Sequence, residues 1–442
     1  MNNVSVNFNV EQGKIKDING VGCAPYKASL GPNQSTIDRT FKATHIPYCR
    51  LHDCGGAARL VDIHKIFPNF DADENDPNSY DFYHTDEYIG AIQKAGAEAY
   101  YRLGCTIEWG SRKEGSVMPK DFNKWTRICE HVIMHYNKGW ANGFNYNIKY
   151  WEIWNEPENP GNSFGPCMWS GTKEEFFDLY KISSKYLKEK FPEISIGGYG
   201  SCGFYTISRP NAPANRKDFI TYFIDFLEMV KKEKCPLDFF SWHIYSKDPE
   251  EIMVHARYVR EKLDEYGFEN TESHLNEWNY QDEGTIYKCK HTMDGGSFLT
   301  KSMTLMQRNR DIDKAMYYCM SVGGLYNGFI DHNDGSLSPA WYAYVAIGHV
   351  CYLGTDVLTE YDGDVHALAA KNESESAILL TNHKCEDEKV TLNAQGIVGK
   401  KAVVIYNTDE KHMKEEYSFT VCDKLTFELS VPQNTVVLIK FI

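Results

Sequence analysis

The stretch Lys149-Tyr150-Trp151-Glu152-Ile153-Trp154-Asn155-Glu156-Pro157 begins as a run of large, mostly apolar residues and ends in a polar pair followed by proline. Such a run is typical of a buried strand. Functional groups of a parallel barrel gather where its strands end and its loops begin. We therefore expect Asn155 and Glu156 at the carboxyl end of a buried strand, where partial burial suits a carboxylic acid that donates a proton. The alternative is a loop glutamate that caps the next turn.

A second stretch, Ser273-His274-Leu275-Asn276-Glu277-Trp278-Asn279, repeats this pattern further along the chain. If Glu156 ends the fourth strand of a barrel and Glu277 the seventh, the two carboxylates face each other across its mouth. Two facing carboxylates are what the hydrolysis of a glycosidic bond requires. Glu272 and Glu283 are competing candidates, but neither ends an apolar run as cleanly.

Strand-like runs alternate with helix-like segments between residues 18 and 354. The helical segments carry local signals, such as the capping box of Thr172 and Glu175 and the Asp248-Pro249 start of another helix. Repeated strand–helix units imply a parallel sheet, and eight of them favour a closed barrel over an open doubly wound sheet. The eight expected strands are 21–24, 48–52, 98–103, 149–154, 195–198, 239–245, 274–278 and 315–320.

The sequence pattern changes after Gly354, where short alternating strands replace the strand–helix units. The segment 425–431 alternates apolar and polar residues, and so does the segment 4–10 at the amino end. We expect an α/β protein with two parts. Residues 15–354 form a catalytic (β/α)8 TIM barrel, and residues 1–14 together with 355–442 form a small antiparallel, β-sandwich-like accessory domain.

Charge and composition limit the partners of this 442-residue chain. Its formal net charge is −14 and it has no basic run, so we expect no nucleic-acid partner. No segment has the roughly 20 apolar residues of a membrane span, and the amino end lacks the pattern of a signal peptide. The thirteen cysteines form no C-x-x-C pair. Scattered cysteines beside apolar residues favour a reducing cytoplasm. The sequence leaves the oligomeric state open.

A metal or another cofactor is not expected. Asp71, Asp73 and Asn75 resemble the start of a calcium loop, but Asp76 stands in place of its glycine and Phe82 in place of its last ligand. The chain has no zinc-ligand spacing, no P-loop and no G-x-S-x-G motif.

The stretches 154–157 and 276–279 resemble the two catalytic stretches of the clan A retaining glycosidases. The segment from Tyr80 to Glu98 and the triplet Arg50-Leu51-His52 resemble glycoside hydrolase family 39 in particular. This family contains β-xylosidases and α-L-iduronidases on a (β/α)8 barrel with an added β module. The resemblance extends over roughly residues 15–350.

The resemblance implies a role for each matching residue. Glu156 would be the acid/base and Glu277 the nucleophile, while Asn155 would donate a hydrogen bond to the sugar 2-hydroxyl. Arg50 would orient the nucleophile. The expected substrate-binding residues are Arg50, His52, Asn155, His243, Tyr245 and Trp278.

One position departs from the pattern of these relatives. They usually carry a tryptophan at the end of the eighth strand as a sugar platform, whereas this chain has Tyr318-Cys319-Met320-Ser321. Either Trp109, Trp169 or Trp278 replaces it or the platform is absent, and of the three we expect only Trp278 to lie near the site.

The sequence thus predicts a retaining glycosidase that acts on small oligosaccharides, with exo-cleavage of β-D-xylosides as the leading hypothesis. An endo-acting enzyme, or one that cleaves uronides or arabinosides, is an alternative within the same family. A uronidase should present arginine or lysine in its sugar pocket. A silent carbohydrate-binding protein is the alternative outside enzymes, but such a protein has no use for two facing carboxylates.

Overall fold

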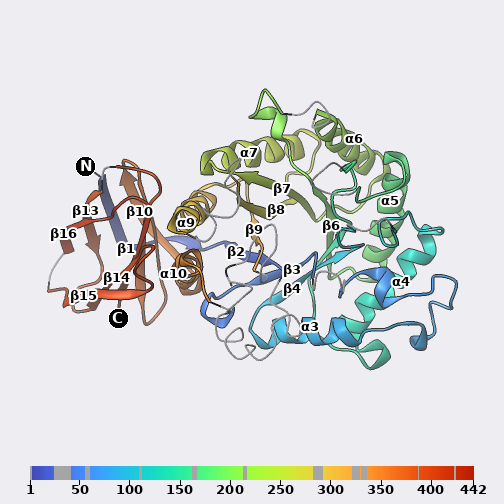
Figure 1. Ribbon diagram of the computed structural model, residues 1–442, viewed down its shortest axis with the longest axis horizontal. Coiled ribbons are helices and arrows are strands. Elements are labelled where there is room, and N and C mark those ends of the chain that lie inside the picture. Colours follow the sequence, from blue (N-terminus) through green and yellow to red (C-terminus); the bar gives the residue numbers. More distant parts are fainter. Residues whose placement is uncertain are drawn as a thin grey trace.

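The computed structural model describes residues 2–23, 41–54, 60–108, 112–161, 167–212, 217–281, 292–320, 329, 336–386, 388–422 and 425–442. It contains a closed barrel of parallel strands and a separate curled sheet, which Figure 1 shows side by side with two helices between them. Trp109, Ser321 and Glu283 lie outside the described residues.

The barrel consists of eight strands in chain order, which confirms the expected (β/α)8 fold. A strand forms at each predicted place, with its ends shifted by a few residues. The strands are β2 (Asp17–Gly22), β3 (Tyr48–Leu51), β4 (Glu98–Leu103), β5 (Tyr150–Ile153), β6 (Ser195–Ser201), β7 (Phe239–Ser246), β8 (Glu272–Tyr280) and β9 (Lys314–Tyr318).

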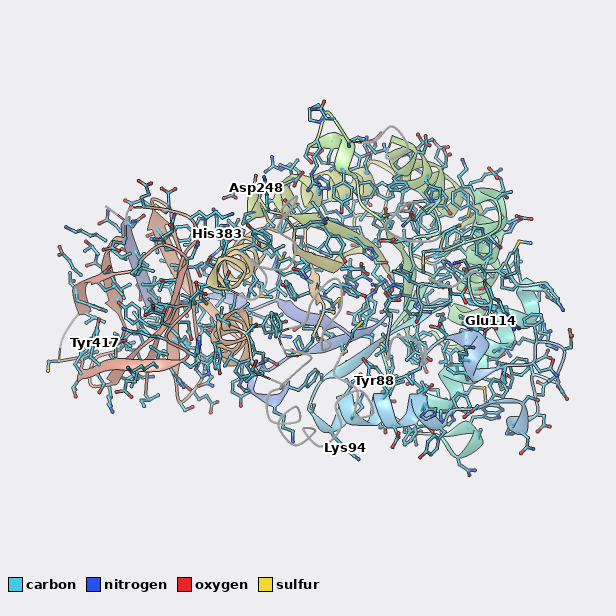
Figure 2. All side chains as sticks on the ribbon, in the orientation of Figure 1. Tyr88, Lys94, Glu114, Asp248, His383 and Tyr417 are labelled. Carbon is cyan, nitrogen blue, oxygen red and sulfur yellow. The ribbon has the colours of Figure 1, made fainter. Side chains whose placement is uncertain are left out.

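Helices surround the barrel and cover its outer face with apolar side chains. The capping signals hold at both predicted starts: Thr172 and Glu175 bond each other's backbone N–H, and Asp248 accepts from the Glu250 N–H at 3.0 Å. Figure 2 labels Asp248 at the start of its helix. The helices are α2 (Ile63–Ile66), α3 (Tyr83–Lys94), α4 (Phe122–Lys138), α5 (Lys173–Lys190), α6 (Lys217–Glu233), α7 (Pro249–Glu265), α9 (Met293–Arg308) and α10 (Pro339–Leu353), with short 3-10 turns η4 (Pro77–Ser79), η5 (Trp140–Asn142) and η6 (Tyr205–Ile207).

The accessory sheet has nine strands in the order β15-β14-β17-β12-β11-β10-β1-β13-β16. It is mixed rather than antiparallel as expected, because the amino-terminal strand pairs antiparallel with β10 but parallel with β13. The strands are β1 (Asn2–Lys14), β10 (Thr355–Asp362), β11 (Val365–Lys371), β12 (Ser376–Asn382), β13 (Lys389–Gln395), β14 (Lys401–Asn407), β15 (Lys414–Thr420), β16 (Leu425–Ser430) and β17 (Thr435–Phe441).

Alternation along the sheet's central strands builds two apolar layers. In β12, Ile378 and Leu380 face the inside of the curled sheet, whereas Ala377 and Leu379 belong to the core shared with the barrel. The helices α9 and α10 pack between the sheet and the barrel. At this junction the ring of His383 lies 2.9 Å from the Ser297 hydroxyl of α9 (Figure 2).

No helix in the described ranges combines the length and the apolar character that a membrane crossing needs.

Gly348 in α10 provides a test of this packing. A Cβ built there would lie 2.2 Å from the carbonyl oxygen of Thr44, a backbone atom that cannot rotate away. We expect Gly348→Ala to lower the free energy of unfolding by about 1–3 kcal/mol. Gly90→Ala in α3 is the matched control. Its Cβ would meet only the Tyr146 hydroxyl at 3.6 Å, so the better helix propensity of alanine should stabilise by about 0.5–1 kcal/mol. Urea unfolding of both variants should show shifts of opposite sign, and two shifts of equal sign would contradict the packing.

Candidate active site

A buried ion pair lies inside the barrel. The Arg50 guanidinium, from β3, is fully buried and places its Nε 2.8 Å from Oε2 of Glu152, on β5. The other Glu152 oxygen accepts from the Ser241 hydroxyl and from the Asn276 amide, each at 2.6 Å. Burial alone would raise the pKa of Glu152, but Arg50 and these donors outweigh it and hold that pKa below its usual value. A charged, fully partnered Glu152 therefore fixes the guanidinium.

The remaining nitrogens of Arg50 reach two of the predicted site residues. Its Nη1 lies 2.9 Å from Oε2 of Glu277, and its Nη2 donates to Oδ1 of Asn155 at 2.6 Å. Gly200 leaves room for this arrangement, since a Cβ there would lie 3.1 Å from Nη2 of Arg50 and its φ is +63°. One guanidinium thus joins the two stretches that the sequence singled out.

A β-bulge explains how β8 presents its functional residues. The pairing between β7 and β8 shifts by one residue at Asn276. A bulge interrupts the alternation of side chains between the two faces of a strand. Asn276 and Glu277 consequently both point into the barrel, where Asn276 contacts Glu152 and Glu277 contacts Arg50.

Trp278 points the other way. Its ring is fully buried in the layer between barrel and helices, with centroids 5.2 Å from Tyr317 and 6.3 Å from Phe298 of α9. The structure therefore does not bring Trp278 together with the other predicted residues. Trp169 is also buried, against Trp154, and neither ring offers a face to a sugar.

Both oxygens of Glu277 are held. Oε2 receives Arg50, and Oε1 accepts from the Tyr245 hydroxyl at 2.7 Å. The backbone of Tyr245 is held in turn, because its carbonyl accepts from Nη2 of Arg209 at 2.7 Å. Arg209 itself forms a bidentate ion pair with Glu251 of α7, in which its Nε and Nη2 lie 2.8 and 2.7 Å from the two carboxylate oxygens.

Glu156 lies just beyond the end of β5 in a left-handed backbone conformation, with φ of 48°. Its N–H lies near the carbonyls of Tyr199 and Gly200, at 3.1 and 3.0 Å. The Oε1 atom is 2.8 Å from Nδ1 of His243, and Oε2 accepts from the Asn159 amide at 3.1 Å. The side chain keeps 13% of its surface exposed, which leaves it accessible from the barrel mouth.

One carboxylate oxygen of Glu156, one of Glu277 and a ring nitrogen of His243 all lie within 4.8 Å of one another. Burial alone would lower the pKa of His243, but the Glu277 charge and the bond to Glu156 outweigh it, so this pKa is raised. Three such groups could in principle hold a metal ion. However, Arg50 already brings a positive charge to Glu277, so the donor set fits a hydrogen-bonded pair of carboxylates better than a cation site.

The other predicted residue, His52, follows β3 and is buried beside Asp53. Its Nε2 lies 3.5 Å from the Asp53 Oδ1 atom. Burial and the charges of Arg50 and Arg102 hold the pKa of His52 well below its usual value, so the ring is neutral. Asp53 also accepts from the Ile107 N–H.

Sequence reasoning missed several residues of this site: Glu152, Asn159, Ser241, Asn276, Asp53 and Tyr318. Glu152 carried the clearest signal, since a glutamate within an otherwise apolar strand requires a buried partner. Asn276 sits next to Glu277 in the sequence, but strict alternation would have turned it away from the barrel.

The arrangement can perform acid–base and nucleophilic chemistry. A carboxylate fixed by Arg50 and Tyr245 is oriented as a nucleophile, and a second carboxylate beside His243 can exchange a proton. Residues 19–279 match the family model described as glycosyl hydrolases family 39. The chain belongs to that family. The matched range covers more than half of the chain and contains both carboxylates.

Curated relatives of this family 39 chain match it over a shorter range. A β-xylosidase of Geobacillus stearothermophilus is 26% identical over 181 residues, which are 36% of this chain and 32% of that protein. An α-1,4-L-rhamnosidase of Formosa agariphila is 26% identical over 146 residues, 32% of this chain and 26% of that protein. The matches thus span a third or less of the length of these relatives.

Solved structures resemble the family 39 chain over its whole length. A glucosidase from Croceicoccus marinus has a TM-score of 0.83 and 21% identity, covering 100% of this chain and 98% of that one. A monomeric β-xylosidase from Caulobacter crescentus has a TM-score of 0.73 and 16% identity, with 99% of each chain covered. At such identities the likeness extends to the fold alone.

The ion pair behind Tyr245 generates a pH-dependent prediction. Burial alone would raise the pKa of Glu251, but Arg209 and the hydroxyls of Ser208 and Ser246 lower it from 4.5 to about 2. A lowered pKa stabilises the fold above the pKa of the unfolded chain, and the stabilisation is lost as the pH falls toward the folded value. We expect Glu251→Gln to cost about 1.5–3 kcal/mol at pH 7, with a smaller deficit at pH 3. Urea unfolding at both pH values measures it.

Glu265→Gln in the same helix is the control, because Glu265 keeps 58% of its side chain exposed in its pair with Lys262. An exposed pair of this kind contributes at most about 1 kcal/mol. A Glu251→Gln deficit that stayed constant with pH would mean that the carboxylate charge does not act through Arg209.

Proposed function

We propose that the protein is a retaining glycosidase that hydrolyses β-D-xylosides from the non-reducing end of small oligosaccharides, with Glu156 as acid/base and Glu277 as nucleophile. The observation that carries the proposal is the close approach of the two carboxylates, since one oxygen of Glu156 lies within 4.8 Å of one oxygen of Glu277. Retaining glycosidases hold their carboxyl groups about 5–5.5 Å apart, whereas inverting enzymes need about 6.5–9.5 Å to admit a water between them.

In the first step a Glu277 oxygen attacks the anomeric carbon and forms a glycosyl ester. The bond between that carbon and the leaving oxygen breaks, and Glu156 gives its proton to that oxygen. Arg50 and Tyr245 direct the nucleophile through both of its oxygens. His243, bonded to Glu156, helps to keep a proton at this position.

In the second step Glu156 takes a proton from water, which attacks the anomeric carbon and releases Glu277. Two displacements restore the original configuration. Asn155 supports this mechanism, because Arg50 occupies its Oδ1 and leaves the amide nitrogen as the donor for a sugar hydroxyl. Such a bond to the 2-hydroxyl strengthens in the transition state.

The sugar is inferred from relatives. Membership in family 39 and the similarity to the Geobacillus β-xylosidase support β-D-xylosides as substrates. Arg50 is a weak candidate to bind a uronate, since it is fully buried and each of its three nitrogens already donates to a protein group.

Azide rescue separates the two carboxylate roles. Glu156→Ala should still glycosylate from a dinitrophenyl glycoside, because this leaving group needs no proton, and should then stall for lack of a base. Azide needs no base, so it should restore turnover and give a glycosyl azide of retained configuration. Glu277→Ala should block the first step. Azide in the vacated space attacks directly and gives the inverted product. NMR of each product measures the anomer.

Glu98→Ala is the control, because Glu98 is exposed at the opposite end of the barrel, at the start of β4. It should keep wild-type turnover with and without azide. Retained product from Glu277→Ala, or inverted product from Glu156→Ala, would exchange the two roles.

A panel of p-nitrophenyl glycosides tests the substrate. We expect kcat/KM for the β-D-xyloside to exceed that for the α-L-arabinoside, β-D-glucoside and β-D-glucuronide by at least about 10-fold, because one extra or misplaced ring substituent costs about 1–3 kcal/mol in a fitted pocket. A higher kcat/KM for another sugar would refute the xyloside assignment, and no hydrolysis of any sugar would favour a binding protein.

A further inference from the structure

Asp53 is an acidic residue at the barrel mouth that the mechanism does not use. It directly follows His52 after β3, in a left-handed conformation with φ of 54°, which aspartate tolerates better than most residues. Its side chain keeps 15% of its surface exposed. Burial is the main cause that raises the pKa of Asp53 to about 6, and the Glu277 charge raises it further.

Three protein groups hold this carboxylate in place. Oδ1 accepts from the Ile107 N–H at 2.9 Å and lies 3.5 Å from the His52 ring, while Oδ2 accepts from the Tyr318 hydroxyl at 2.9 Å. The Tyr318 ring belongs to a small buried cluster against which Tyr245 packs. Since Tyr245 donates to Glu277, Asp53 and Tyr318 lie on the Tyr245 side of Glu277.

The carboxylate has acceptor capacity left over. An ionised carboxylate offers about four acceptor sites, and among the described residues its hydrogen-bond donors are the Ile107 N–H and the Tyr318 hydroxyl, with the His52 ring farther off at 3.5 Å. Sugar hydroxyls are donors of the kind that fill such sites. Asp53 is a weaker candidate for a salt bridge than for binding a sugar hydroxyl, because Arg102 pairs with Asp62 instead.

We propose that the Asp53 carboxylate, oriented by Tyr318 and Ile107, accepts a hydrogen bond from a hydroxyl of the sugar ring bound against Glu277, and thereby selects neutral sugars over uronic acids. The inference rests on the proposed function and specifies its substrate class. A uronate placed there would bring a further negative charge beside Asp53 and Glu277. Two negative charges close to each other repel more strongly in a partly buried site than in water.

The test compares Asp53→Asn with wild type on dinitrophenyl β-D-xyloside, on its 3-deoxy and 4-deoxy analogues, and on the β-D-glucuronide. Asparagine keeps the size of the side chain and removes its charge. We expect kcat/KM for the parent xyloside to fall about 10- to 100-fold, as for a lost hydrogen bond to a charged group. The loss should shrink to less than about 3-fold for the analogue that lacks the contacted hydroxyl, since no bond remains to lose. The ratio of glucuronide to xyloside activity should rise.

Tyr318→Phe keeps the test valid if Asp53→Asn does not fold. It removes one donor to Asp53, so it should change the deoxy pattern in the same direction and by less. Tyr317→Phe is the matched control on the same strand, because the Tyr317 hydroxyl donates to Asn279 and not to Asp53. It should leave the ratio of parent to deoxy substrates unchanged.

Equal losses on every analogue and an unchanged glucuronide ratio would overturn the inference and reduce Asp53 to a structural residue. A wild-type preference for a uronide would also overturn it, while the roles of Glu156 and Glu277 would stand. A preference for another neutral sugar would refute only the xyloside assignment, and the deoxy series is then made on that sugar. A wild type that hydrolyses no glycoside would refute both proposals.

Discussion

The architecture of the site depends on one buried positive charge. The Arg50 guanidinium lies inside the barrel with no exposed surface, and a buried charge without partners costs several kcal/mol. Its three nitrogens are instead shared among Glu152, Glu277 and Asn155, which come from two strands on different sides of the barrel. Glu152 is the fixed counter-ion, so Glu277 can change its bonding during a reaction without leaving Arg50 unpaired.

Glu152 and Glu277 have different roles at Arg50, so substitutions that affect them would have different effects. Removing Glu152 would leave Arg50 with Glu277 as its remaining carboxylate, so Glu277 would become the counter-ion of the buried guanidinium. Ser241 and Asn276 complete the bonds of Glu152 and thereby hold the counter-ion that fixes Arg50 beside Glu277. The bulge in β8 makes these contacts possible, because without it the side chains of Asn276 and Glu277 could not both point into the barrel.

The sequence predicted the barrel well because its signals are local. Each buried strand reads as an apolar run, and the capping residues at Thr172 and Asp248 mark helix starts. The two carboxylates were predictable because each follows such a run. Trp278 was misplaced for a different reason: its orientation depends on the register between β7 and β8, which no local pattern specifies. The contact between Asp53 and Tyr318 was not predicted, because it joins the segment after β3 to β9, which lie far apart in the sequence. The parallel pairing of β1 was missed because alternation gives the same pattern for either direction.

The position of β1 has a consequence for how the chain is made. This strand leaves the ribosome before the whole barrel, yet both of its neighbours in the sheet, β10 and β13, come from beyond residue 354. Domains generally fold as units while synthesis proceeds at about 5–20 residues per second, so β1 waits on the order of tens of seconds for its partners. During that interval Val4, Val6 and Phe8 have no sheet to enter, and the backbone N–H and C=O groups of this strand stay open to pairing with another strand.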